Sequence, residues 1–442
     1  MGSSSTHALY GVLLTVLAIV AASTSQHEAF HKRHNTPRAA TGPPMVFAHY
    51  MISYQPPNLN YTTDMLLAKN AGIDAFAVNY GGWSASWPYF EHYLNVMYTT
   101  AEKLGFKLFL CMDTTSVPNA AMVVNLTNFY ADNPAQAKDA HGHIFLSSFE
   151  TGPPPWNWQT DVINHIKVPV TFLPGTLSQD AEYTLSQNQG FGPFTWIHPA
   201  CNATGEGAID TQYTDMRNSN GAPWMAGVAP WFFKRLSPSM NWLHAQDSYM
   251  WIDRWMNLLK LKPNYIEIIT WNDFGESSYI GPRDPTPAAT LANPSTPGYY
   301  GNLDHSGFLK MAALFIKAFK AGEEQVTVSS NEEDVFMFYR IQPAGTLGLT
   351  DTMPLPENVS SIEDNVYVVP FLSSEATVSL NSGGKPWSMD APAGVSKGTF
   401  GPFTWGNQIL TASRPINGQT LHKQGPPIVG HLPRYQGNVV SI

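Results

Sequence analysis

The chain has 442 residues, of which 43% are hydrophobic, 12% aromatic and 13% charged, and its formal net charge at pH 7 is -9. This composition is far from that of a disordered chain, and the length suits a barrel of about 250 residues with a smaller module. The acidic charge disfavours nucleic acid and anionic membranes as partners and favours a neutral substrate.

Residues 1–26 are predicted to be a signal peptide. An apolar run over residues 9–22 follows a polar start, and it is too short to span a bilayer. Residues 27–44 are predicted to be a leader or linker, in which Lys32 and Arg33 form either a second processing site or a chance basic pair. Export is also favoured by four Asn-x-Ser/Thr sequons, which begin at Asn60, Asn125, Asn202 and Asn358. We therefore expect a secreted protein, located in the extracellular space or the cell wall.

Strand-like and helix-like runs alternate from residue 45 to residue 322. The expected strands cover residues 45–51, 73–80, 106–113, 143–150, 168–174, 193–198, 224–232 and 265–271. The expected helices cover residues 63–70, 90–104, 119–131, 158–165, 180–187, 209–218, 242–261 and 306–321. Eight strands alternating with eight helices predict an α/β fold, a (β/α)8 TIM barrel over residues 45–322.

The pattern changes after Gly322. Short alternating runs, separated by Gly and Pro and without helical periodicity, occupy residues 335–341, 366–372, 377–380 and 408–412. They predict an antiparallel β-sandwich over residues 323–442. We expect it to pack against the barrel rather than to bind carbohydrate independently.

The chain contains two cysteines, Cys111 and Cys201. Export permits a disulfide bridge between them, but Cys111 lies in an expected core strand, where a free buried thiol fits equally well. The sequence leaves this choice open.

The expected eighth strand runs directly into a polar segment. Residues 265–280 read YIEIITWNDFGESSYI, so an apolar strand is followed by two carboxylates, Asp273 and Glu276. The C-terminal ends of parallel strands open onto the active-site face of α/β folds. Two carboxylates that share a cleft but differ in environment are what acid/base cleavage of a glycosidic bond requires. Asp273 and Glu276 are therefore predicted to be catalytic, although an isolated acidic pair is more often a helix cap or a surface pair.

Polar and aromatic residues recur where the expected strands end. Together they would form a ring on the catalytic face, because aromatic faces stack on sugar rings and polar groups bind hydroxyls. Taken singly, each could instead cap a strand or belong to the core. The predicted substrate-binding residues are His49, Asn79, Asp113, Glu150, Trp196, His198, Trp231, Trp271, Asn272 and Tyr279.

Several other chemistries lack their motifs in this sequence. It contains no Gly-x-Ser-x-Gly elbow, Walker loop or dinucleotide fingerprint. His141 and His143 precede an expected strand, and a turn explains them more simply than a metal site because no His-Glu-x-x-His accompanies them. We expect no catalytic metal and no cofactor.

The octapeptide TWNDFGES at residues 270–277 resembles glycoside hydrolase family 71, the fungal α-1,3-glucanases or mutanases. The resemblance extends from Val46 to the C-terminus. It includes FAHYM at 47–51, GIDAF at 72–76, GFKLF at 105–109, SFE at 148–150, PWFF at 230–233 and RW at 254–255.

This resemblance implies a (β/α)8 barrel with a C-terminal β-domain. It also implies hydrolysis of α-1,3-linked glucan, such as mutan or pseudonigeran, with inversion at the anomeric carbon. Carried onto this chain, it makes Asp273 the general base that activates water and Glu276 the general acid. Inversion would place their carboxyls about 6.5–9.5 Å apart. We expect the enzyme to act as a monomer on the polysaccharide.

The chain departs from the family pattern at three strand ends. Ala229 replaces a serine, Glu150 is separated from its glycine by Thr151, and the sixth unit reads TWIHP at 195–199. Linkage preference and endo or exo action therefore stay open. The alternatives are a barrel hydrolase of another neutral glucan, with retention as an option, and a wall-associated glucan-binding protein without turnover.

Overall fold

The computed structural model describes residues 42–54, 56–81, 90–150, 152, 154–176, 194–195, 210–221, 223–243, 249–282 and 303–442. Several predictions fall outside these ranges: the signal peptide, the linker up to residue 41, the helix at 180–187, and Trp196, His198 and Cys201. Nothing in the described part of the chain is a helix with the length and hydrophobicity needed to cross a bilayer.

Eight parallel strands pair side by side in the order β1-β10-β7-β6-β5-β4-β3-β2, and the pairing of β2 with β1 closes the order. Their bounds are β1 (Met45–Met51), β2 (Ala75–Tyr80), β3 (Lys107–Asp113), β4 (Ile144–Glu150), β5 (Val170–Thr176), β6 (Phe194–Thr195), β7 (Met225–Val228) and β10 (Tyr265–Ile268). The predicted α/β class is confirmed. All eight expected barrel strands have a counterpart; β7 and β10 are shorter than expected, and of the expected strand at 193–198 the structure describes only residues 194 and 195.

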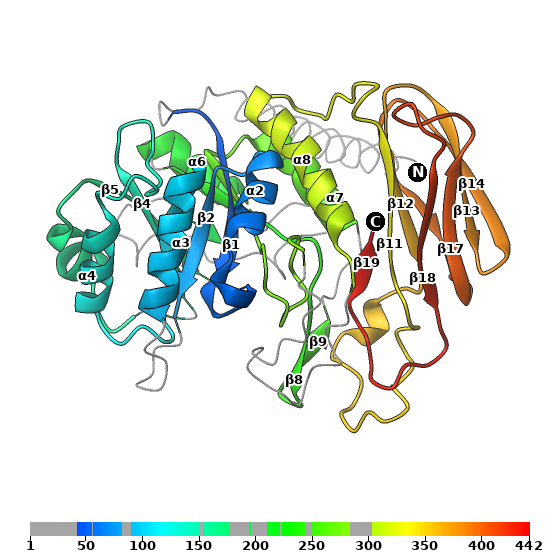
Figure 1. Ribbon diagram of the computed structural model, residues 1–442, viewed down its shortest axis with the longest axis horizontal. Helices are drawn as coiled ribbons and strands as arrows, with labels where there is room; N and C mark the ends of the chain where they lie inside the picture. Colours follow the sequence, from blue (N-terminus) through cyan, green and yellow to red (C-terminus); the bar gives the residue numbers. More distant parts are fainter. Residues whose placement is uncertain are drawn as a thin grey trace, which may run out of the picture. The chain divides into compact units, whose positions relative to one another are not determined.

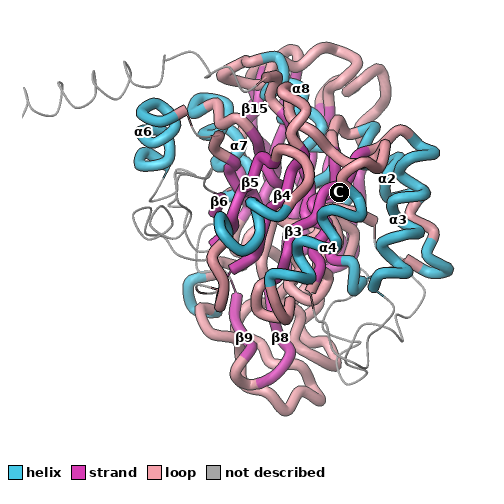
Figure 2. Tube along the Cα trace, turned by 90° about the vertical axis from the view of Figure 1, so that its left-hand side faces the viewer, coloured by secondary structure: helices cyan, strands magenta, loops and turns pink. Residues whose placement is uncertain are grey.

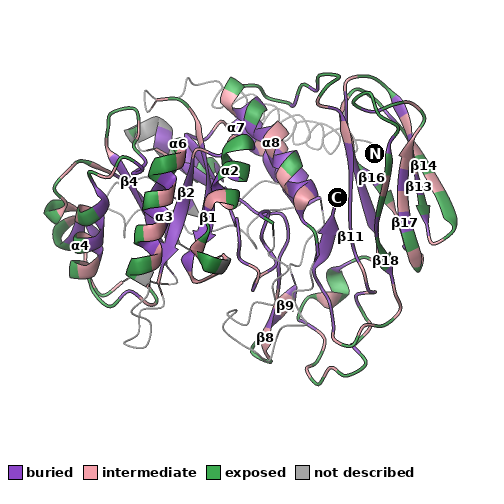
Figure 3. Ribbon diagram, in the orientation of Figure 1, coloured by how far each residue is buried: buried purple, intermediate pink, exposed green. Residues whose placement is uncertain are grey.

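Helices lie along the outside of this sheet, with their exposed faces turned away from the strands (Figures 2 and 3). They are α2 (Thr62–Asn70), α3 (Phe90–Leu104), α4 (Ala120–Tyr130), α6 (Asp210–Asn220), α7 (Met250–Leu261) and α8 (Ser306–Ala321). Local signals set their ends. The side chain of Asn119 accepts a hydrogen bond from the backbone N–H of Met122 at the start of α4, and α8 stops at Gly322, which takes the left-handed conformation.

Two expected helices differ from the structure. Residues 158–165 form a short π-helical turn and a 3₁₀ turn instead of an α-helix. The expected helix at 242–261 starts only at Met250, because residues 233–243 form an antiparallel hairpin of β8 (Phe233–Ser237) and β9 (Met240–Leu243). This hairpin extends away from the parallel strands (Figure 1).

The interior of the closed sheet is filled by aromatic rings near the N-terminal ends of its strands. Phe47 packs against Phe109 with ring centroids 4.9 Å apart and against Phe145 at 5.2 Å, and Phe145 packs against Tyr265 at 5.0 Å. Alternate strand residues point inward, so these rings form one layer. Because aromatic rings fill this end, the C-terminal ends of the strands are the expected side for a ligand.

Residues 323–442 form two antiparallel sheets. One has the order β15-β12-β11-β19, with β16 on β12, and the other has the order β14-β13-β17-β18. The strands are β11 (Asp334–Arg340), β12 (Val366–Leu372), β13 (Ala376–Ser382), β14 (Lys385–Ala391), β15 (Gly394–Val395), β16 (Gly398–Phe400), β17 (Gly406–Ala412), β18 (His422–Ile428) and β19 (Val439–Ser441).

Alternation along β11 gives its sheet two buried faces. Val335 and Met337 belong to the core shared with Val378 and Leu380 of the second sheet. The opposite face of this sheet is turned toward α8. Phe338 of β11 contacts Phe308 at a centroid distance of 5.4 Å, and Phe371 of β12 contacts Phe315 at 5.5 Å. The sheet that contains β11 and β12 therefore packs directly on α8, and the second sheet packs on its other face.

Candidate active site

The segment after β10 folds back on itself. The backbone N–H of Thr270 donates to the carbonyl of Ser278 at 2.8 Å, and that of Ile280 donates to the carbonyl of Thr270 at 3.0 Å. Asp273 and Glu276 lie in the turn between these anchors. The loop thus presents both carboxylates at the open end of the closed sheet.

Asp273 is fixed by its own turn. Its backbone N–H donates to Thr270 Oγ1 at 2.7 Å, and its Oδ1 accepts the backbone N–H of Glu276 at 2.9 Å. Asp273 is only 6% exposed. Burial, and then the negative charge of Glu276, raise the pKa of Asp273 to about 8, although Lys234 and the neighbouring backbone N–H groups oppose the shift. Asp273 therefore tends to keep its proton at neutral pH.

Glu276 lies in a different environment. Its Oε1 accepts a hydrogen bond from Lys234 Nζ at 2.8 Å, in an ion pair whose two side chains are each 20% exposed. Its backbone carbonyl accepts the N–H of Phe233 at 2.8 Å. The two predicted catalytic carboxyls thus differ as acid/base chemistry requires, one buried and one paired with a cation.

Asn272 does not point at a ligand. Its Oδ1 accepts the backbone N–H of Met51 at 2.7 Å, and its Nδ2 donates to the carbonyls of Met51 at 3.1 Å and Tyr54 at 3.4 Å. The amide therefore ties the catalytic loop to the end of β1. These backbone contacts occupy both ends of the amide, and a contact of Asn272 with substrate stays a prediction.

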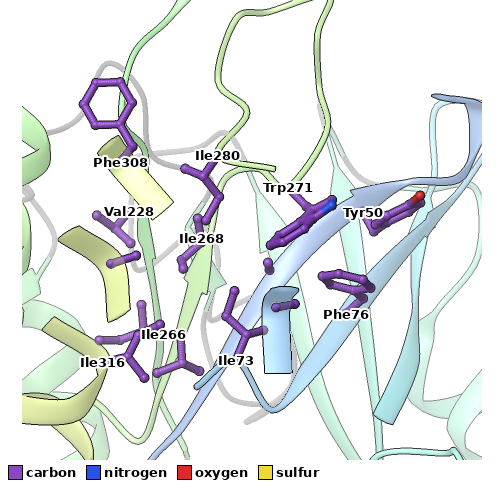
Figure 4. Packing of buried hydrophobic residues seen from close by; sticks show 14 of the residues in the cluster. Tyr50, Ile73, Phe76, Val228, Ile266, Ile268, Trp271, Ile280, Phe308 and Ile316 are labelled. Carbon is purple, nitrogen blue, oxygen red and sulfur yellow. The ribbon is translucent and has the colours of Figure 1, made fainter. Parts of the chain in front are cut away.

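Three predicted aromatic residues are packing residues in this structure. Trp271 is 0% exposed and lies over Phe76 at a centroid distance of 5.1 Å, beside Tyr50 (Figure 4). Tyr279 is also fully buried, stacks on His305 at 3.9 Å and donates its hydroxyl to the carbonyl of Leu303. Both side chains pack in the core here, and their contact with substrate stays a prediction.

Trp231 is 4% exposed, and its indole N–H donates to the carbonyl of Gly437 at 3.0 Å. It joins the segment after β7 to the C-terminal region, and its contact with substrate stays a prediction. The strand-end pattern could not separate these tryptophans from binding residues, because it does not reveal which way a side chain points once the strand has ended.

His49 belongs to a buried pair that the sequence analysis missed. Its Nδ1 lies 2.8 Å from Glu267 Oε1, and both side chains are fully buried inside the closed sheet. Burial raises the pKa of Glu267, and the hydrogen bond with His49 opposes this shift. A glutamate inside the apolar strand YIEII was a visible signal for such a partner. His49 is fully buried below the catalytic loop, and its contact with substrate stays a prediction.

Glu150 lies at the C-terminal end of β4. Its Oε1 accepts hydrogen bonds from Ser148 Oγ at 2.5 Å and from Trp158 Nε1 at 3.0 Å. Burial raises its pKa to about 7, against the effect of these two donors. Glu150 lines a hollow of about 300 Å³, which is completed by Pro154, Pro155, Trp156, Asn157, Trp158 and Asp161.

The hollow and the catalytic loop lie across the same opening. Between β4 and β10 stand β5, β6 and β7 on one side and β3, β2 and β1 on the other. Glu150 therefore lies opposite Asp273 on the rim of the closed sheet.

Asn79 and Asp113 also lie on this rim. Asn79 is the penultimate residue of β2 and is 7% exposed, whereas Asp113 Oδ1 accepts the backbone N–H and the hydroxyl of Thr115, at 3.0 Å and 2.6 Å. The two contacts with Thr115 are those of a capped turn, and Asp113 is half-buried. The structure brings both residues to the face that carries Asp273.

The cysteine and histidine motifs have simple local explanations. Cys111 is a free, buried thiol. Asp139 Oδ1 accepts the backbone N–H groups of His141 and His143, so these histidines belong to a capped turn. Within the described ranges, no group of three or more His, Cys, Asp or Glu side chains has an arrangement that could hold a metal ion.

Comparison with known proteins adds independent information. Residues 43–440 match the family model described as Glycosyl hydrolase family 71. The chain is 29% identical over 416 residues to a glucan endo-1,3-alpha-glucosidase of Schizosaccharomyces pombe, covering 90% of this chain and 94% of that protein. It is 30% identical over 391 residues to a mutanase of Penicillium rubens, covering 85% and 83%.

Solved structures are more distant. A GH99 endo-alpha-mannosidase from Bacteroides thetaiotaomicron aligns with 63% of this chain and 98% of its own, at 14% identity and a TM-score of 0.47. An endo-beta-1,4-mannanase from Thermotoga petrophila aligns with 90% of this chain and all of its own (100%), at 10% identity and a TM-score of 0.39.

Proposed function

Because the chain belongs to glycosyl hydrolase family 71, it is a glycoside hydrolase, and we propose that it cleaves α-1,3-glucosidic linkages in glucan. The two relatives whose names state this activity or mutanase activity resemble it over most of their length. The observation that carries the proposal is the pair at the open end of the sheet, buried Asp273 and Lys234-paired Glu276.

The pair supplies what hydrolysis of a glycosidic bond needs. One carboxyl must donate a proton to the leaving oxygen while the other, ionised, activates a water molecule. Two interacting carboxyls release their protons in steps that belong to the pair as a whole. With the pKa of Asp273 raised to about 8, the pair holds one proton at neutral pH, which is the required state.

We assign the base to Asp273 and the acid to Glu276, following the family resemblance, with inversion of the anomeric carbon. The opposite assignment is the second candidate, and a specific observation favours it. Burial keeps the proton on Asp273 in the free protein, while Lys234 compensates the charge of Glu276. Under the first assignment, the proton has to pass from Asp273 to Glu276 before the bond breaks.

Substrate contacts complete the proposal. Asn79, Asp113 and Glu150 lie on the rim, and Trp196 and His198, which lie outside the described residues, are proposed to join them. We assign the hollow at Glu150 to a glucosyl unit away from the cleaved bond, because the half-buried Trp156 supplies aromatic surface beside a carboxyl group.

The same proposal covers organisation and location. It comprises a signal peptide at 1–26, a linker at 27–44, a (β/α)8 barrel at 45–322 and a β-sandwich at 323–442. The closed order of eight strands and the core shared by the two C-terminal sheets support it. We further propose that the protein is secreted, glycosylated and monomeric.

The experiment that tests the function measures reducing sugar released from insoluble α-1,3-glucan, beside starch, β-1,3-glucan and cellulose. Release from the α-1,3 polymer alone is expected. Release from another glucan instead would establish a barrel hydrolase of different linkage. Binding to a glucan without any release would establish a glucan-binding protein.

A further inference from the structure

We propose that Lys234 is a positioning residue for Glu276, and that the C-terminal region holds Lys234 in place through its neighbour Arg235. The inference rests on the proposed function, because it requires Glu276 to take part in the reaction. It assigns the β8–β9 hairpin and the C-terminal region a role in catalysis that neither strand ends nor family motifs indicate.

The β8–β9 hairpin donates two hydrogen bonds to Glu276. Lys234 Nζ donates to its carboxylate at 2.8 Å, and the adjacent backbone N–H of Phe233 donates to its carbonyl, also at 2.8 Å. Trp242, directly opposite Lys234 in the hairpin register, has its ring centroid 5.6 Å from the Lys234 ammonium. The Lys234 ammonium therefore has a cation–π contact with Trp242 on the neighbouring strand.

Arg235 fixes the hairpin from its other face. Adjacent strand residues point to opposite sides, so Arg235 turns away from Glu276. Its side chain is 0% exposed. One guanidinium nitrogen donates to Asn241 Oδ1 and the carbonyl of Pro354, both at 2.6 Å, and another donates to Asp351 Oδ2 and the carbonyl of Met353, both at 2.9 Å. These contacts bind β8 to residues 351–354 of the C-terminal region.

The partner strand is held by the same region. The backbone N–H of Leu243 donates to the carbonyl of Glu357 at 3.1 Å, and the N–H of Glu357 donates to the carbonyl of Asn241 at 3.0 Å. The side chain of Asn358 donates to the carbonyl of Leu243 at 3.2 Å. Both strands of the hairpin are thus clamped by residues far along the chain.

The charges around Glu276 make the role measurable. Among the described residues, the turn contributes Asp273, β8 contributes Lys234, and Tyr54 reaches the turn at Gly275 from the segment after β1. Lys234 is the cation of this set. Removing it leaves two carboxyls that repel each other, so both titration steps of the pair move to higher pH, whichever carboxyl is the acid.

The experiment compares Lys234→Met, Lys234→Arg and Lys320→Met on α-1,3-glucan across pH. Lys320 is the matched control, because its Nζ lies 2.7 Å from the carboxylate of Asp74. Asp74 is the residue before β2, at the end of the parallel sheet away from Asp273 and Glu276. Lys234→Met is expected to lower kcat by about 10- to 100-fold. It should also move the acidic limb of the pH profile up by about one unit. Lys234→Arg should keep the acidic limb of the pH profile at its wild-type pH. Lys320→Met should match the wild type in both kcat and pH profile.

A second variant tests whether the contacts of Arg235 with residues 351–354 hold the hairpin in place. Asp351→Asn removes the charge that Arg235 meets without altering any residue of the catalytic loop. It is expected to lower kcat several-fold while leaving the pH limb near that of the wild type, because Lys234 keeps its charge. Thermal unfolding of every variant confirms that it is folded.

Wild-type kcat and an unmoved pH limb in folded Lys234→Met would overturn the role of Lys234. Wild-type kcat in Asp351→Asn would overturn the role of the C-terminal clamp. Failure of the proposed function looks different, since the wild type itself would then release no sugar from α-1,3-glucan.

Discussion

The backbone N–H of Glu276 donates a 2.9 Å hydrogen bond to Oδ1 of Asp273, so the two carboxyls belong to one rigid turn. This contact has the geometry of a helix cap, which was the alternative explanation of the pair. Here the capping contact and the chemistry are compatible, because it uses Oδ1 of Asp273 and the main chain of Glu276. The carboxylate of Glu276 remains directed at Lys234.

The first prediction separates the acid from the base. Under the assignment that we propose, Glu276→Gln loses about 100- to 10,000-fold on the polymer but keeps activity on an α-glucosyl fluoride substrate, whose leaving group needs no proton. Asp273→Asn should lose activity on both substrates. The reverse pattern would make Asp273 the acid, as its burial in the free protein favours.

The second prediction concerns pH. Burial and the charge of Glu276 raise the pKa of Asp273 to about 8, so the free enzyme should lose the single shared proton near pH 8. Since kcat/KM reports the free enzyme, it is expected to fall as the pH rises through about 8. A fall that is already complete by pH 6 would contradict the buried state of Asp273.

The third prediction concerns the buried pair below the loop. His49→Ala leaves Glu267 buried without its partner, and breaking a buried pair costs about 3–5 kcal/mol. Urea unfolding should show this loss, and Glu267→Gln added to His49→Ala should recover part of it. A raised KM with unchanged stability would instead return His49 to the substrate-binding residues.

The fourth prediction concerns the hollow on the opposite rim. Glu150→Gln keeps the size of the side chain but removes its charge, so KM for long α-1,3-glucan chains should rise by about 10-fold. Short oligosaccharides that do not reach the hollow should be hydrolysed as before. Glu324→Gln, at a surface pair with Lys262, is the matched control. Equal effects on long and short chains would rule out a distant subsite.

The sequence predicts this fold well where one physical rule governs a segment. Apolar strands such as 45–51 and 107–113, and the helix that stops at Gly322, follow from periodicity and capping. The β8–β9 hairpin was missed because its residues adjoin a strongly helical pattern, and its stability comes from Arg235 contacts with residues more than a hundred positions away.

The candidate site was predicted only in part for a related reason. Residue type and strand position predict Asp273, Glu276 and Glu150, since all three carboxyl groups follow or end an apolar strand of the parallel sheet. Neither rule reveals side-chain direction after a strand has ended. Asn272 therefore binds backbone and Trp271 enters the core, although both were expected to contact substrate.

The most direct test of the account compares the wild type with folded Asp273→Asn and Glu276→Gln in the release of reducing sugar from insoluble α-1,3-glucan. The account predicts release by the wild type and a loss of about 100- to 10,000-fold in each variant. Near wild-type release by either variant would contradict the assignment of this pair as the catalytic carboxyls.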